Sequence, residues 1–266
     1  MGENDKEMTT LDDIPVNVDV ELVRFDPIFE TKAFTWSNQG KNIREWVQHF
    51  SSMFRCEWHE AYFVIFNTRL DIQSLRNTFP KLRRICINCR RNEPNHQEIQ
   101  SIENILKAFL PNVKCVRLHR VPLQENLSIQ HIGMTNLKEL RLHSPNLKFD
   151  DLLTMNVESC TIFRTHFSVR DLNRFFKLWK KGSYHNLHSL SILMRLETTA
   201  DWNILLKGLN AEEADNSQGL VEVRRFIIDI SRGFCAQVRI QSIDMPATAR
   251  LEISKVQRSS PDVWRF

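Results

Sequence analysis

SVRDLNRFFKLWKKGSYHNLHSLSILM, residues 168–194, contains the pattern of a complete helix, a turn and a strand. Ser168 and Asp171 have the S-x-x-D spacing of a capping box, in which each side chain can bond a free backbone N–H group at a helix start. Gly182 tolerates the left-handed conformation in which many helices end. Between these signals, apolar residues recur with the 3.6-residue period of one helical face: Leu172, Phe175, Phe176 and Trp179. The segment therefore predicts an amphipathic helix that packs by one face and leads into a strand.

The strand that follows has the pattern L-x-x-L-x-L, and this pattern recurs along the chain. Five clear copies are present: Leu82–Ile85–Ile87, Val113–Val116–Leu118, Leu137–Leu140–Leu142, Val157–Cys160–Ile162 and Leu187–Leu190–Ile192. Weaker copies at Ala61–Val64–Phe66 and Val223–Phe226–Ile228 extend the series at both ends. The first positions of neighbouring copies lie 20 to 36 residues apart, a range that overlaps the ~20–29-residue period of leucine-rich repeats. We therefore expect an α/β fold, an irregular leucine-rich-repeat-like solenoid of strand–helix units.

The two ends of the chain predict hairpins. Alternating apolar residues in Val16–Leu22 predict a strand that pairs with Thr31–Trp36 in an N-terminal hairpin. Strands at Val238–Ile240 and Leu251–Ile253 predict a C-terminal hairpin that caps the open end of the solenoid. The polar stretch Ala211–Gly219 between them and the repeats predicts a loop.

Composition divides the chain into three parts. Residues 1–14 are acidic and contain few apolar side chains, which predicts a disordered N-terminus. Residues 15–256 form the repeat domain, and residues 257–266 form a tail. With 266 residues, of which 42% are hydrophobic, the chain has enough material for a sizeable core.

Motifs and composition argue against an enzyme and against a membrane protein. No apolar run approaches the ~18 residues of a membrane-spanning helix, and six scattered cysteines suit free thiols in an intracellular, reducing compartment. No phosphate-binding glycine loop and no G-x-S-x-G motif is present. Cys86 and Cys89 form a C-x-x-C pair, but their side chains point to opposite faces of a strand, which disfavours a metal site. We therefore expect no cofactor, no metal ion and no catalytic residue.

The segment Asp171–Ile192 closely resembles the hallmark of the nematode F-box-associated domain, type 2. That family has a D-L-N-x-F-L-x-x-W-x-x-G-S segment followed by L-x-x-L-S-I. The matching residues are Asp171, Leu172, Asn173, Phe175, Trp179, Gly182, Ser183, Leu187, Leu190, Ser191 and Ile192. Further similarity at Trp46–His49 and Thr78–Leu82 extends the resemblance over roughly residues 15–256. The resemblance implies a non-catalytic protein-interaction domain, the substrate-recognition part of an F-box receptor for cullin-based ubiquitin ligases.

Members of that family usually begin with an F-box, the helical segment that binds the ligase adaptor. Its leucine-rich L-P pattern is not visible in the short acidic stretch before the first predicted strand. We therefore expect this chain to supply the target-binding surface. A ligase adaptor would be a partner only through an F-box that lies outside this chain.

The repeat pattern also predicts a binding surface. If positions 1, 4 and 6 of each copy face the core, positions 3, 5 and 7 face outward together. Since arginine and aromatic residues are common in binding hot spots, we expect a protein-binding site that contains Arg84, Arg117, His119, Arg141, His143 and Phe163. Residues 81–120 contain nine Lys or Arg and three Glu, so the expected partner has an acidic patch. The alternative interpretation is a solvated sheet face without a partner.

A nucleic-acid-binding module is the alternative function. The pI of about 8.8 and the basic segment 81–120 suggest it. Against it, this segment lacks the interleaved aromatic residues that stack on single-stranded bases. The whole chain also has nearly balanced charge, with a net of +4. We therefore expect a protein partner rather than a nucleic acid.

Overall fold

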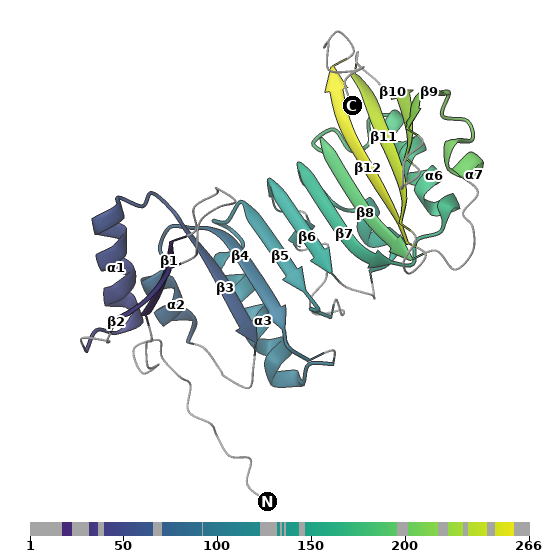
Figure 1. Cartoon of the computed structure of the whole chain (residues 1–266). Helices are drawn as coiled ribbons and strands as arrows, with labels where there is room; N and C mark the ends of the chain where they lie inside the picture. The colour runs from purple at the N-terminus through teal and green to yellow at the C-terminus, as the bar shows by residue number, and fades with distance from the viewer. Residues whose placement is uncertain are drawn as a thin grey trace, which may run out of the picture.

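A ten-stranded sheet is the main feature of the structure, which is a computed structural model. The described residues are 18–22, 32–36, 40–65, 71–91, 93–122, 132–133, 135, 137–143, 147–195, 202–217, 223–230, 234–243 and 248–257. The strand order in the sheet is β3-β4-β5-β6-β7-β8-β12-β11-β10-β9. The sheet extends through most of the length of the molecule (Figure 1).

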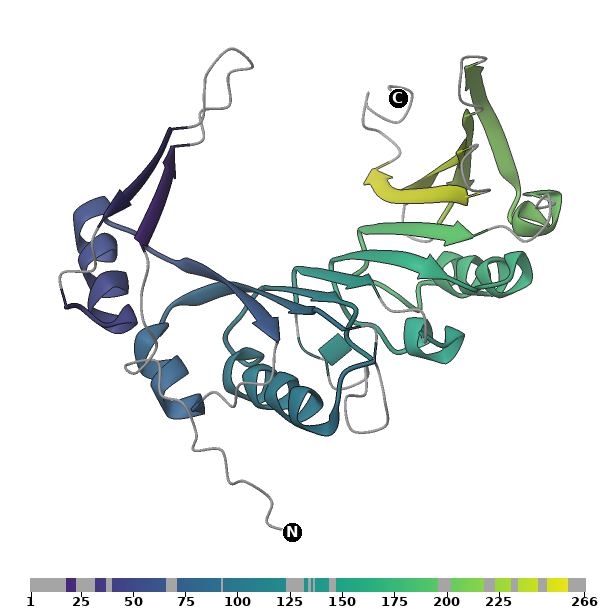
Figure 2. The same ribbon diagram turned by 60° about the horizontal axis from the view of Figure 1, so that its bottom comes forward.

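Six parallel strands form the first part of the sheet in chain order. They are β3 (His59–Ile65), β4 (Leu82–Cys89), β5 (Cys115–His119), β6 (Glu139–His143), β7 (Ser159–Thr165) and β8 (Ser189–Arg195). Parallel neighbours need crossover connections, and four of these contain α2 (Ile72–Thr78), α3 (His96–Phe109), α5 (Phe149–Leu153) and α6 (Val169–Lys180). Figure 2 shows these helices on the convex side of a curved sheet. The opposite side of the sheet is here named the concave face.

The five clear triplets form the core, as the sequence predicts. Positions 1, 4 and 6 of every one of these triplets are buried. The strand register aligns equivalent positions, so that one buried row contains Ile85, Val116, Leu140, Cys160 and Leu190. Because a buried Leu or Ile side chain contributes ~1.5–3 kcal/mol, each added unit extends one continuous apolar layer between the sheet and the helices.

The weak triplet Ala61–Val64–Phe66 is wrong for β3. Val64 is 52% exposed on the concave face, and Phe66 lies outside the described residues. The residues of β3 that contact the core are Ala61, Phe63 and Ile65. Alternate residues of a strand share a face, so Val64 lies on the same side as Tyr62. Two apolar side chains on the outer face made the pattern ambiguous.

The last part of the sheet is antiparallel, and two expectations for it are wrong. β10 (Val223–Asp229) pairs antiparallel with β11 (Phe234–Ile243) and with β9 (Ala211–Ser217). Val223–Phe226–Ile228 is therefore no parallel repeat unit, and residues 211–217 are a strand rather than a loop. The apolar pattern of one strand does not specify the direction of its neighbour. The polar sequence of β9 has no apolar alternation that would mark a strand, and β9 lies at the sheet edge, where it pairs with β10 only.

Both predicted hairpins are present. β1 (Val18–Leu22) pairs antiparallel with β2 (Lys32–Trp36) in a separate two-stranded sheet. β11 pairs with β12 (Thr248–Gln257), and β12 pairs with β8. This hairpin therefore adds strands beside β8, whose backbone groups would otherwise be open to another chain. The predicted disordered residues 1–14 lie outside the described residues. Of the predicted tail, residues 257–266, Gln257 is instead the last residue of β12, and the other residues lie outside the described part of the chain.

The predicted start of α6 has the expected capping geometry. In α6, the Asp171 backbone N–H donates to Ser168 Oγ at 3.1 Å, and the Ser168 N–H donates to Asp171 Oδ2 at 3.1 Å. α1 (Ile43–Phe54) has the same reciprocal bonds between Asn42 and Glu45. Another short helix, α7 (Trp202–Leu206), follows β8. Within the described ranges, no helix is both long and apolar enough to span a bilayer.

Candidate protein-binding surface

The concave face carries ordered rows of side chains. The register of β4 to β8 places positions 3, 5 and 7 of neighbouring triplets side by side, as the sequence predicts. The position-5 row contains Cys86, Arg117, Arg141, Thr161 and Ser191. The position-7 row contains Asn88, His119, His143, Phe163 and Leu193. Because these rows cross five strands, residues from distant parts of the sequence form one surface.

An open groove of about 500 Å³ follows the position-7 row. Five of the six predicted site residues line it, namely Arg117, His119, Arg141, His143 and Phe163. Arg84, the sixth, lies beside the groove in the position-3 row, next to Cys115. Tyr62 of β3 and Leu193 of β8 line the two ends of the groove. The structure therefore brings the predicted residues together on one surface.

The position-7 row is connected by hydrogen bonds and ring contacts. Asn88 Nδ2 donates to Tyr62 Oη at 2.8 Å, and Asn88 Oδ1 lies 2.8 Å from His119 Nδ1. Since the Asn88 carbonyl oxygen can only accept, His119 Nδ1 carries the proton in this arrangement. The His119 and His143 rings follow with centroids 4.4 Å apart, and Phe163 meets His143 edge-on at 6.0 Å. The floor of the groove thus changes from polar at β3 to aromatic and aliphatic at β7 and β8.

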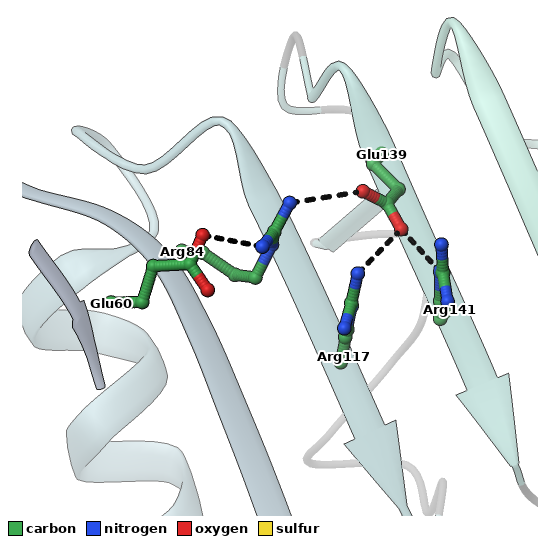
Figure 3. Close-up of polar contacts among 5 residues, drawn as sticks. All are labelled: Glu60, Arg84, Arg117, Glu139 and Arg141. Atoms are coloured by element: carbon green, nitrogen blue, oxygen red, sulfur yellow. Dashed lines mark hydrogen bonds and ion pairs between the residues drawn. The ribbon is translucent and has the colours of Figure 1, made fainter. Parts of the chain in front are cut away.

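A charged cluster borders the groove and contains Glu60, Arg84, Arg117, Glu139 and Arg141; we call it the polar cluster (Figure 3). Glu139 lies at its centre, and its carboxylate contacts three arginines. Oε2 is 3.6 Å from Arg84 Nη2, whereas Oε1 is 3.3 Å from Arg117 Nη2 and also contacts Arg141 Nε. Arg84 additionally pairs with Glu60 on β3. The cluster therefore joins four neighbouring strands.

The polar cluster carries an excess of positive charge. Burial raises the pKa of Glu139, but the charges of Arg141 and Arg117 lower it by more, so that the pKa lies below its usual value. With both carboxylates ionised, three arginines face two glutamates, a net charge of +1. The buried Nε–H groups of Arg84 and Arg117 also make no hydrogen bond within the described part of the chain. Such donors favour an additional acceptor.

Three further residues of this surface are not among the six predicted site residues. Glu139 occupies position 3 of its triplet, so the pattern does place it on the concave face, but its contacts with arginines depend on strand order. Asn88 was on the same predicted face, and only the structure shows its bonds to Tyr62 and His119. Tyr62 is absent from the prediction because the triplet Ala61–Val64–Phe66 assigns the wrong residues of β3 to the outer face. The expectation of an acidic patch on the partner rests on the net charge of residues 81–120, and this count leaves out the contacts of Arg84 and Arg117 with Glu139.

The basic segment 81–120 does not form one surface. Arg117 lies on the concave face, whereas Lys107 belongs to α3 and pairs there with Glu103 at 3.4 Å. Arg83 lies over the ring of Trp58 at 4.8 Å. The positive charges of segment 81–120 are therefore divided between the two sides of the sheet. This distribution does not favour the nucleic-acid alternative.

The cysteine pair and the other possible metal ligands are separated in the fold. Cys86 lies in the groove and Cys89 is buried in the core, so the two thiols of the C-x-x-C point to opposite sides of β4. Burial raises the pKa of Cys89 to about 11. Among the residues that the structure describes, His, Cys, Asp and Glu form no group of three that could hold a metal ion.

The hallmark residues of α6 have a structural role. Leu172, Phe175 and Trp179 are buried under the sheet. Asn173 is also buried, and its side-chain amide donates to the carbonyl groups of Leu205 at 2.7 Å and Lys207 at 3.0 Å. This motif therefore attaches the α7 region to α6, on the side of the sheet away from the groove.

Comparison with known families supports the resemblance over part of the chain. A family model described as F-box associated matches residues 128–192. This span includes β6, α5, β7 and α6, and it supplies Glu139, Arg141, His143 and Phe163 to the concave face. The family is one of protein-interaction domains and is not a known enzyme family, so the match supports a role in binding another protein. The search of curated proteins found no match.

Proposed function

We propose that this chain recognises a target protein with its concave face, as the substrate-recognition part of an F-box receptor for a cullin-based ubiquitin ligase. The observation that carries the proposal is the groove itself. It collects arginine, histidine and aromatic side chains beside a cluster with excess positive charge. Arginine and aromatic side chains are enriched at binding hot spots, and charge complementarity selects partners.

The architecture supports the same role. Strand–helix units stacked in chain order from β3 to β8, with their helices on the convex side, are consistent with a leucine-rich-repeat-like solenoid in the parallel part of the sheet (Figure 2). Solenoids of this kind use an extended concave surface for binding. In this proposal, the helix-covered side supplies stability and the concave face supplies specificity.

The ligase part of the proposal rests on the F-box associated match at residues 128–192. The chain would hold the target, and an F-box outside this chain would contact the ligase adaptor. Such a receptor works inside the cell, in the cytoplasm or the nucleus. Ligase subunits should therefore copurify with an F-box-bearing form of the protein, together with the target.

Charge reversal at the groove tests the proposed surface. We expect the double variant Arg117→Glu/Arg141→Glu to lose partners that the unchanged chain retains in affinity purification with quantitative mass spectrometry. Arg239→Glu is the matched control, because Arg239 is also an arginine paired with a glutamate, at 3.6 Å from Glu252 on β12, but lies outside the groove. Thermal unfolding of all variants shows whether each is folded.

Two results would contradict the proposal. In the first, the folded double variant retains every partner, which would leave the concave face a solvated surface. In the second, the chain retains RNA or DNA with a steep dependence on salt concentration, which is the behaviour of a nucleic-acid-binding module.

A further inference from the structure

We propose that the groove recognises an extended, polyproline-II-like segment of the target with an acidic side chain and a large apolar side chain three residues apart. This inference rests on the proposed function and adds the chemistry of the partner. It follows from three features of the groove: a cationic border, an aromatic floor and the distance between them.

The cationic border selects the acidic side chain. Arg117 and Arg141 line the groove, and their side chains are 33% and 44% exposed despite their contacts with Glu139. One more carboxylate would balance the net charge of +1 on the polar cluster. Hydrogen bonds between guanidinium and carboxylate groups are among the stronger kinds in proteins. The bound carboxylate would share these two arginines with Glu139.

The aromatic floor selects the apolar side chain. Phe163 lies edge-on to His143 with ring centroids 6.0 Å apart, and Leu193 follows on β8. The neighbouring position-5 residues are the smaller Thr161 and Ser191, so no long side chain of that row borders this half of the groove. Aromatic side chains pack well in edge-to-face or offset arrangements on such rings. A phenylalanine, tryptophan, tyrosine or leucine of the target fits this half of the groove.

The distance between the two halves sets the spacing. Arg117 and Arg141 lie on β5 and β6, whereas Phe163 and Leu193 lie on β7 and β8, two strands further along. Neighbouring strands are ~4.8 Å apart, and the two residues between the position-5 and position-7 rows span ~6.7 Å along the strand, so the backbones of the two halves are separated by roughly 12 Å. The long, flexible arginine side chains bring their guanidinium groups closer than that to the aromatic half. In a polyproline II segment, which has three residues per turn and a rise of ~3.1 Å per residue, residues i and i+3 lie on one side about 9 Å apart. This conformation presents both side chains to the groove.

Selection from a random peptide library tests the motif directly. Twelve-residue peptides displayed on phage would be selected on the complete chain, and we expect enrichment of Asp or Glu three positions from an aromatic residue or leucine. A selected peptide is then synthesised with an amidated C-terminus, so that its carboxylate comes from a side chain. Fluorescence polarisation measures its Kd beside that of a form with Asp→Asn.

The variants of the chain assign each half of the motif. We expect Arg117→Gln/Arg141→Gln to raise the Kd for the acidic peptide about tenfold, as loss of a charge-assisted hydrogen bond implies. This double variant should bind the Asp and Asn forms of the peptide equally. Phe163→Ala should raise the Kd for both peptides, and this variant should still prefer the Asp form to the Asn form. The controls are Arg239→Gln and Val64→Ala. They change an arginine and an exposed apolar residue of the same face that lie outside the groove. Both variants should bind the peptides with the Kd of the unchanged chain.

The results separate this inference from the proposed function. Enrichment without the three-residue spacing, or an Asp preference that persists in Arg117→Gln/Arg141→Gln, would overturn the inference. If charge reversal still abolishes protein partners in that case, the proposed function stands without the motif. If the peptides behave as expected while charge-reversed chain keeps all its protein partners, the groove binds the motif but the proposed function fails.

Discussion

Glu139 and Arg117 form an ion pair across the β5–β6 boundary, with Oε1 3.3 Å from Nη2. The same oxygen contacts Arg141, and the other oxygen of the carboxylate faces Arg84. One carboxylate thus holds three arginines that would otherwise repel one another. It stabilises the sheet, and it also competes with any acidic group of a partner. These two roles give opposite predictions for its removal.

Glu139→Gln should lower stability at neutral pH. We expect the free energy of unfolding to fall by about 1 kcal/mol, near the upper limit for partly exposed ion pairs. The pKa of Glu139 in the folded chain is below the ordinary value of 4.5, so its contribution is complete above that pH and is lost as the pH falls through the folded pKa. Urea unfolding at pH 7, 4.5 and 3 should therefore show a shrinking difference between the two proteins. A difference that is the same at all three values would contradict this assignment.

The same substitution should strengthen binding of an acidic peptide. Removing the internal carboxylate raises the net charge of the polar cluster from +1 to +2 and leaves Arg117 and Arg141 available. We expect a several-fold lower Kd for a groove-binding peptide with an aspartate. Fluorescence polarisation at two salt concentrations measures it, and the gain should diminish at high salt. Glu103→Gln, which removes a carboxylate on α3, should leave the Kd unchanged.

The two faces of the parallel sheet should respond differently to truncation. Leu140 is fully buried at position 4 of its triplet, and Leu140→Ala should lower the free energy of unfolding by about 3 kcal/mol. Thr161 lies on the concave face, and Thr161→Ala should change the free energy of unfolding by no more than about 0.5 kcal/mol. Equilibrium unfolding in guanidinium chloride compares the two. Equal losses would mean that the face assignment of the triplets is wrong.

The motif residue Asn173 should affect stability without affecting binding. Asn173→Ala leaves the carbonyl groups of Leu205 and Lys207 without their donor, at a cost of about 1–3 kcal/mol. Arg174→Ala, at an exposed position of the same helix, is the control and should have little effect. The Kd of a groove-binding peptide should be the same for the folded Asn173→Ala chain. A weaker peptide affinity would show that α6 contributes to recognition.

Cysteine reactivity should report occupancy of the groove. Burial raises the pKa of Cys86, against the opposing charges of Arg117 and Arg84, and burial raises the pKa of Cys160 to about 12. Cys56 is exposed. With iodoacetamide at pH 8, we expect Cys56 to react first, Cys86 more slowly, and Cys160 only after unfolding, because the thiolate is the reacting form.

A bound peptide should slow the alkylation of Cys86 and leave that of Cys56 unchanged, as measured by mass spectrometry of the digested chain. Equal protection of both cysteines would indicate a change in the whole fold rather than a ligand in the groove.

The sequence predicts the core of the parallel sheet well, because each L-x-x-L-x-L copy marks both the buried side and the outer side of a strand. Arg117, His119, Arg141, His143 and Phe163 follow from that alternation alone, and they do line one groove. The pattern fails where both faces carry apolar residues. Tyr62 and Val64 are outer residues of β3, and Ile227 is buried beside Phe226 and Ile228 on β10.

The remaining features depend on interactions between distant segments. Whether β10 pairs parallel or antiparallel is decided by its neighbours β9 and β11, which its own residues do not specify. The contact of Glu139 with Arg84 joins residues 55 positions apart, on strands separated by β5. The alternation along the sequence therefore places the arginines and Glu139 on one face, but it does not show that this carboxylate contacts the arginines and neutralises part of their charge.

Photocrosslinking from the two sides of the sheet tests the central claim most directly. The photoreactive residue p-benzoylphenylalanine would replace either Phe163 in the groove or Gln100, which is exposed on α3 on the convex side. Binding on the concave face predicts that a copurifying target crosslinks from position 163 and not from position 100. Crosslinking of the target from position 100 alone, or equally from both positions, would contradict the account.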